Sequence, residues 1–169
     1  MLRKLITIIL ILLCFVLQST ILPALSLGGI TPNLLVILTA SVGFTRGDTS
    51  GMLVGFVCGI LTDISYGDML GFYALLLAYI GFVNGQFSRI FYPEDVKLPI
   101  ALIIVSDLTY ELISYIMLFL LRGRLDFLYY FARIIVPKAI YTIVLTLLVY
   151  PLLLIGNRWM ENKEKRSAL

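Results

Sequence analysis

The most constraining feature of the sequence is a succession of apolar runs, several of them long enough to cross a lipid bilayer. Residues 5–22 carry no charged side chain, and as an α-helix they would extend about 27 Å. That length is close to the hydrocarbon thickness of a bilayer, about 30 Å. Composition agrees, because only 14% of the residues are charged, against about 25% in a typical soluble domain. The chain is therefore predicted to be an integral membrane protein.

The other apolar runs extend this pattern to an all-α, polytopic bundle of about six transmembrane helices in one domain, residues 1–169. The predicted spans are 5–22, 32–45, 51–66, 69–87, 98–121 and 134–156. Pro23 and Gly28–Gly29 end the first run, and Pro32 can open the second, because proline suits the first turn of a helix. The second and third runs are short, so they either cross fully or form a re-entrant pair.

The distribution of lysine and arginine predicts the orientation, because the cytoplasmic loops of membrane proteins are enriched in positive charge. With six crossings, the side that holds both termini carries Arg3, Lys4, Arg46, Arg89, Lys97, Arg158, Lys163, Lys165 and Arg166. The opposite side carries Arg122, Arg124, Arg133 and Lys138. Both termini are therefore expected to be cytoplasmic.

Several kinds of chemistry find no support in the residue types present. The sequence contains no histidine, which excludes histidine metal sites and triads of the Ser-His-Asp kind. Cys14 and Cys58 lie in separate apolar runs and form no C-x-x-C pair. The net charge of +3 comes with no basic stripe that nucleic acid would require. We expect no enzyme, no cofactor and no metal site.

Glycines recur at every fourth position, at Gly43, Gly47, Gly51, Gly55 and Gly59. Positions four apart lie on the same face of a helix, and glycine there allows a second helix to approach closely within a membrane. Gly51, Gly55 and Gly59 share one predicted span. They either pack against another helix of this chain or dock a helix of a partner, and the spacing does not separate the two.

Asp63 continues this row near the end of its predicted span. A carboxylate is costly in lipid unless it meets water, a donor or a cation. Asp63 is either an interfacial residue, solvated beside Tyr66, Gly67 and Asp68, or a polar anchor that holds loop or partner groups. Gln18, in the first span, can donate or accept a hydrogen bond across helices and so stabilise their packing.

Asp107 and Glu111 are four residues apart inside one apolar run, so they share a helix face. Two neighbouring anions in hydrocarbon would repel each other and be poorly solvated. They must therefore face the protein interior, a wet cavity or a cation. Lys138 is one candidate cation, although it can also extend to the interface. Protonation of one acid is another solution, and the pair either lines a cavity or forms a proton relay or cation site.

One family shares an ordered series of short motifs with residues 18–75. The motifs are Gln18-Ser19-Thr20, Pro32-Asn33-Leu34, Arg46-Gly47, Gly51, Gly55-Phe56, Gly59-Ile60-Leu61 with Asp63, and Gly67 with Leu70-Gly71. In order, spacing and total length they resemble the rod shape-determining protein MreD family. From about Phe82 onward, the likeness is limited to hydropathy and length.

The resemblance implies a subunit of the bacterial elongation machinery in the inner (cytoplasmic) membrane. Members act with MreC, a single-pass protein with a periplasmic domain, and with the filament MreB, with RodA and with a peptidoglycan transpeptidase. The implied role is a non-catalytic scaffold for lateral peptidoglycan synthesis and rod shape. The family is also similar in fold to the substrate-binding components of energy-coupling-factor transporters.

Two hypotheses about function follow. In the first, the Gly51, Gly55 and Gly59 face, or the neighbourhood of Pro32 and Asn33, receives the transmembrane helix of MreC. The alternative is a small-molecule-binding membrane subunit of an energy-coupling-factor-type transporter. In that case Asp107 with Glu111 could line a ligand cavity inside the bundle.

Overall fold

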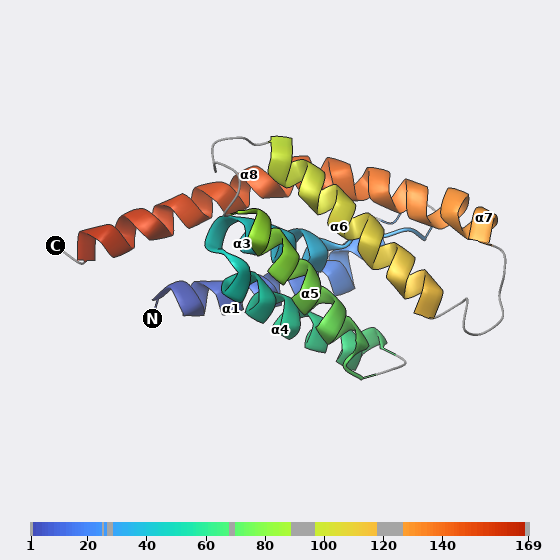
Figure 1. Ribbon diagram of the computed structural model, residues 1–169, viewed down its shortest axis with the longest axis horizontal. Coiled ribbons are helices and arrows are strands. Elements are labelled where there is room, and N and C mark those ends of the chain that lie inside the picture. The colour runs from blue at the N-terminus through green and yellow to red at the C-terminus, as the bar shows by residue number, and fades with distance from the viewer. Residues whose placement is uncertain are drawn as a thin grey trace.

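Six helices of 13 residues or more account for most of the chain in the computed structural model (Figure 1). The structure describes residues 2–24, 26, 29–67, 70–88, 97–117 and 127–167. The six helices are α1 (Leu2–Val16), α3 (Leu34–Arg46), α4 (Asp48–Tyr66), α5 (Phe72–Phe87), α6 (Lys97–Tyr115) and α8 (Val136–Ser167). The predicted all-α bundle of transmembrane helices is confirmed.

Shorter elements extend the first and last helices. A π-helical segment, Leu17–Ile21, and α2 (Leu22–Ala24) continue α1. The helix α7 (Phe127–Tyr130) and a second π-helical segment, Phe131–Ile135, lead into α8. Among the described residues, four stretches are long and apolar enough to cross a membrane, namely Lys4–Ala24, Asp48–Tyr66, Lys97–Tyr115 and Leu128–Trp159.

Each predicted span overlaps one of the six helices, whose ends differ from the predicted ones. The last span was predicted to cover 134–156, yet the chain is helical from Phe127 to Ser167 and α8 continues through Pro151. Pro32 does not open α3, because Asn33 is the N-cap and the helix begins at Leu34. Gly28 and the predicted span ends at residues 69 and 118–121 lie outside the described residues.

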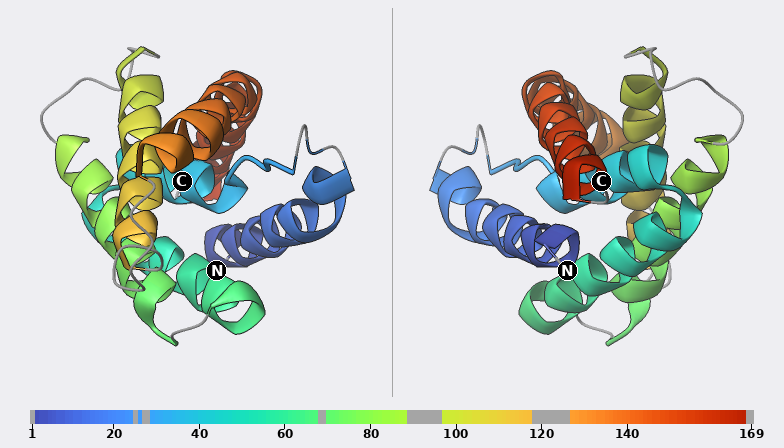
Figure 2. Two further views of the ribbon diagram at one scale, coloured as in Figure 1. Left: turned by 90° about the vertical axis from the view of Figure 1, so that its right-hand side faces the viewer. Right: turned by 90° about the vertical axis from the view of Figure 1, so that its left-hand side faces the viewer.

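Helix α3 forms the centre of the bundle. Every residue from Leu34 to Phe44 is buried, and α3 contacts α1, α4, α5, α6 and α8. A helix that is apolar on all sides is expected in such a position. Figure 2 shows the other helices arranged around it. With 13 residues, α3 extends only about 20 Å, and the non-helical segment 31–33 precedes it.

A turn at Gly47 joins α3 directly to α4. Its φ of +90° is a conformation that glycine adopts without steric cost. The turn falls in the gap between the spans predicted at 32–45 and 51–66, and α4 runs back along α3. The most extensive helix contact in the bundle follows, between α4 and α5.

The start of α1 and the end of α8 lie at the same end of the bundle (Figure 1), as an even number of crossings requires. We call this the proximal end, and the opposite one the distal end. Large apolar side chains on α1, α4 and α8 are exposed, among them Leu13, Leu53, Ile64, Val144 and Leu148. In a bilayer this surface faces lipid. The side of the membrane on which the termini lie stays a prediction.

Candidate functional site

A polar cavity of about 220 Å³ lies at the distal end of the bundle. Its lining comes from the π-helical segment Leu17–Ile21, α2, the segment before α3, the end of α4, the start of α5, and from α6 and α8. The lining residues are Gln18, Pro23, Thr31, Pro32, Asn33, Thr62, Tyr66, Tyr73, Tyr110 and Lys138. The cavity therefore brings together four predicted site residues from distant parts of the sequence, at positions 18, 32, 33 and 138.

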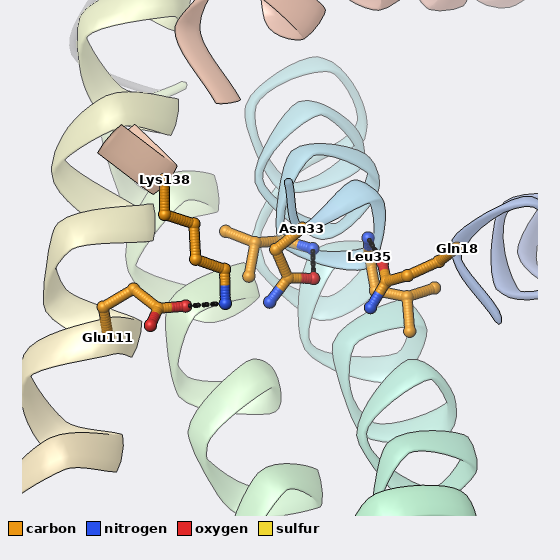
Figure 3. Close-up of polar contacts among 6 residues, drawn as sticks. Gln18, Asn33, Leu35, Glu111 and Lys138 are labelled. Atoms are coloured by element: carbon orange, nitrogen blue, oxygen red, sulfur yellow. Dashed lines mark hydrogen bonds and ion pairs between the residues drawn. The ribbon is translucent and has the colours of Figure 1, made fainter. Parts of the chain in front are cut away.

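The N-terminus of α3 is capped from two directions at this cavity (Figure 3). Gln18 Oε1 accepts a hydrogen bond from the Leu35 amide at 3.1 Å, and Asn33 Oδ1 accepts one from the Val36 amide at 3.3 Å. The first amides of a helix have no partner within the helix, and lipid offers none. The predicted hydrogen bond of Gln18 across helices is confirmed, and its partner is a backbone amide.

Asp63 caps α5 in the same way but from a neighbouring helix. Its Oδ2 accepts hydrogen bonds from the Gly71 and Ala74 amides at 3.1 and 2.9 Å, and its Oδ1 accepts one from the Tyr73 amide at 3.0 Å. A carboxylate at a helix N-terminus is favoured both by these donors and by the helix dipole.

Of the two roles predicted for Asp63, the polar anchor that holds loop groups is confirmed. The interfacial, solvated role is wrong, because only 3% of the residue is exposed. The start of α5 lies against the end of α4, where water does not reach the free amides of α5. These amides therefore need an acceptor from the protein.

Lys138 forms an ion pair with Glu111 across the contact between α8 and α6. The distance from Nζ to Oε1 is 2.6 Å, and Figure 3 shows the ammonium directed toward the carboxylate. Glu111 is buried and the lysine side chain is 22% exposed. Lys138, one candidate cation for the acidic pair, thus meets Glu111, and its partly exposed side chain also lines the distal cavity.

Asp107 lies one turn before Glu111 on the same face of α6, as predicted, and is also buried. Neither of its carboxylate oxygens has a hydrogen-bond partner among the residues that the structure describes. Thr142 of α8 lies beside it. Its buried hydroxyl is the hydrogen-bonding neighbour of this carboxyl group across the contact between α8 and α6, although the contact does not have full hydrogen-bond geometry.

Gly51, Gly55 and Gly59 lie inside the bundle, on the face of α4 that contacts α5, whereas Gly43 belongs to α3 and Gly47 to the turn between α3 and α4. A Cβ at Gly51 would overlap the Gly81 carbonyl, one at Gly55 the Leu77 carbonyl, and one at Gly59 the backbone of Ala74. This is the internal packing that the sequence left open. The proposed docking of a partner helix onto these three glycines is not supported by this arrangement, because α5 already occupies the face.

A second polar contact, at the proximal end, was missed by the sequence analysis. Arg46 donates from Nε to Asn157 Oδ1 at 2.8 Å and from a terminal nitrogen to Thr7 Oγ1 at 2.6 Å. It therefore connects the end of α3 to α1 and α8. Asn157 directly follows the last predicted span, 134–156, and no short-range signal relates it to a residue 111 positions earlier.

These contacts connect helices and satisfy backbone amides. Among the described residues, no group of three or more His, Cys, Asp or Glu side chains could hold a metal ion. Both cysteines are buried free thiols. The arrangement can hold helices in fixed positions and can present a polar cavity at the distal end.

Comparison with known proteins gives one match that covers nearly the whole chain. A family model described as the rod shape-determining protein MreD matches residues 1–156. No curated protein and no solved structure matches the chain. The likeness in fold to energy-coupling-factor transporter components therefore stays a prediction.

Proposed function

The chain belongs to the rod shape-determining protein MreD family, and from this premise we propose that it is a non-catalytic membrane scaffold of the bacterial elongation complex. Membership implies a role in rod shape and a multi-pass position in the inner membrane. The proposed partner is an MreC-like single-pass membrane protein. Through it, the chain would support lateral peptidoglycan synthesis together with MreB, RodA and a peptidoglycan transpeptidase.

The observation that carries this proposal is the family match over residues 1–156. The polar groups inside the bundle support it, because those with partners cap helices or connect them. A protein whose buried polar groups hold helices in place suits a role in positioning other proteins.

The cavity beside Pro32 and Asn33 is the proposed site of contact with the partner. It lies at the distal end, which the predicted orientation puts on the periplasmic side, where MreC has its soluble domain. Its lining combines tyrosine, amide and hydroxyl groups, and a polar segment flanking a transmembrane helix could bond to these. The glycine face, by contrast, is filled by α5.

A tryptophan placed in the cavity tests this site. Thr31→Trp should fill part of the space beside Pro32 and strongly reduce recovery of an MreC-like protein after gentle affinity purification from native membranes. The matched control is Ile64→Trp, which adds the same side chain at a position that is 71% exposed on α4. Equal recovery of the partner with both variants, at equal amounts of inserted protein, would contradict the proposed site.

A further inference from the structure

Two basic side chains lie within the last membrane span, near its distal end. Arg133 and Lys138 both belong to the stretch Leu128–Trp159, and Arg133 lies in its second turn. The helix surface around them is apolar and faces outward, since Leu128 is 86% and Ile140 58% exposed. A cation in such a position is costly unless it meets water, an acidic side chain or another anion. Each of the two cations therefore requires a partner.

Lys138 has an acidic partner, and Arg133 has none among the described residues. The ammonium of Lys138 pairs with Glu111. The guanidinium of Arg133 lies 5.6 Å from the centre of the Tyr129 ring, and a cation–π contact of this kind leaves its charge uncompensated. Within the ranges that the structure describes, no acidic side chain forms an ion pair with Arg133. Its charge is therefore open to an anion from outside the chain.

Arg133 and Lys138 line the same cavity, which has a volume of about 280 Å³ and which we call the basic cavity. The charged side chains in its lining are both basic, and the hydroxyls of Thr31 and Tyr129 supply further donors. Several donors around one space suit an anion. The planar guanidinium in particular matches the oxygens of a phosphate group, to which it can donate two parallel hydrogen bonds.

An apolar groove of about 230 Å³ continues from the basic cavity along α8. Its lining residues are Ile30, Pro137, Ile140, Tyr141 and Val144. Ile30 lines both spaces, and a further cavity lined by Ile30, Arg133 and Pro137 joins them. Because Ile140 and Val144 follow Lys138 along α8, the groove runs from the distal end toward the middle of the span. Val144 is 51% exposed, so the groove faces lipid.

We propose that the basic cavity and the apolar groove together bind one anionic phospholipid, for which phosphatidylglycerol is the probe. A phospholipid presents its groups in the same order, with a phosphate at the interface and acyl chains below it. The phosphate accepts hydrogen bonds from Arg133 and Lys138, and one acyl chain lies along Ile140 and Val144. The single negative charge of the lipid compensates the charge of Arg133, as in other basic pockets between membrane helices.

This inference goes beyond the proposed scaffold function and does not rest on it. The polar cavity assigned above to the partner is lined by Lys138 but not by Arg133. A lipid is favoured over an acidic segment of a partner protein, because the groove descends into the span, where acyl chains surround the protein in any bilayer. The bound lipid connects the segment before α3, through Thr31, to α8 and so stabilises the distal end.

The test is a titration of the purified full-length chain in detergent with two lipids, followed by native mass spectrometry. Phosphatidylglycerol and phosphatidylcholine with the same acyl chains differ in net charge. About one phosphatidylglycerol per chain should bind, about fivefold more tightly than phosphatidylcholine. Arg133→Gln should abolish this preference. The matched control is Arg158→Gln, the same change at an exposed position near the proximal end of α8, which should keep it.

A second pair of variants tests the groove and serves also if Arg133→Gln fails to fold. Val144→Trp should weaken the binding of both lipids by filling the groove. Leu148→Trp, one turn later on the same face of α8 but outside the groove, should leave it unchanged.

Three results would overturn the proposal. Equal affinity for the two lipids, or an equal loss of preference with Arg133→Gln and Arg158→Gln, would indicate unspecific lipid contact. Displacement of the lipid by inorganic phosphate, with no effect of Val144→Trp, would indicate a site for small anions. Loss of an MreC-like protein in affinity purification with Arg133→Gln, at an unchanged lipid preference, would assign the basic cavity to an acidic segment of that partner.

Discussion

Two regions of the bundle hold their helices together in different ways. In the α3, α4 and α5 region, glycines bring backbones into direct contact, as where Gly55 lies against the Leu77 carbonyl. Between α6 and α8, the contact contains the Glu111–Lys138 ion pair, together with Asp107. The first contact is steric and apolar, and the second is polar and charged.

The comparison shows how helices associate where lipid removes the usual hydrophobic driving force. Close approach gains dispersion contacts and requires small residues, whereas polar groups gain hydrogen bonds or ion pairs that lipid does not offer. The glycine contact should therefore be sensitive to added volume and insensitive to salt or ions. The charged contact should tolerate changes in volume and respond to changes in charge. Four substitutions separate these expectations.

The largest effect is expected for Gly55→Leu. Even a Cβ at this position would overlap the backbone of α5, so a leucine would separate α4 from α5 at a cost of about 3 kcal/mol or more. Most of the folded, monodisperse protein should be lost in size-exclusion chromatography in detergent. The matched control is Phe56→Leu, next to it in sequence but 44% exposed. A Gly55→Leu variant that elutes like this control would refute the steric account.

The second-largest effect is expected for Lys138→Met, which removes the charge and keeps most of the apolar volume. Glu111 would then be buried without its partner, at a cost of about 3 kcal/mol. The Tm in detergent should fall accordingly. Combining Lys138→Met with Glu111→Gln should recover most of the loss, because no unpaired charge then remains. If the double variant is as unstable as the single one, volume rather than charge governs this contact.

Asp63→Asn tests a position where both kinds of contact occur, because this polar side chain caps a helix of the glycine-packed region. The amide keeps the size of the carboxylate but directs an NH₂ group at backbone donors, so at least one of the three hydrogen bonds is lost. We expect a destabilisation of about 2 kcal/mol. Hydrogen exchange should show the first amides of α5 becoming less protected. Unchanged protection at Tyr73 and Ala74 would contradict the capping role.

The smallest effect is expected for Gln18→Leu. The Leu35 amide would lose one acceptor, while Asn33 continues to cap the next amide. A single hydrogen bond between membrane helices contributes about 0.6 kcal/mol on average, so the Tm should fall by only a few degrees. The matched control is Gln86→Leu on α5, whose exposed side chain donates only a long, surface hydrogen bond to Asp48 Oδ2 at 3.4 Å. A fall no greater than that of the control would show that α1 is held by packing alone.

Local features of the sequence determined where the helices lie and which polar residues share a helix face. Hydropathy placed the helices, because backbone groups in lipid must bond within a helix. The helical period put Asp107 and Glu111 on one face, and the scarcity of buried cations made Lys138 one candidate partner for them. These properties are readable within one turn or one span. The motifs of residues 18–75 also indicated the family, which the match over residues 1–156 confirms.

Only the tertiary structure decided which helix meets which face. A glycine row has the same spacing whether its neighbour is α5 or a partner helix, so the periodicity could not assign it. The acceptor role of Asp63 depends on where α5 begins, and the contact between Arg46 and Asn157 joins residues 111 positions apart. The physical reason is that helical geometry fixes the residues that share a face. The neighbour of that face is selected by contacts between segments that are distant in the chain.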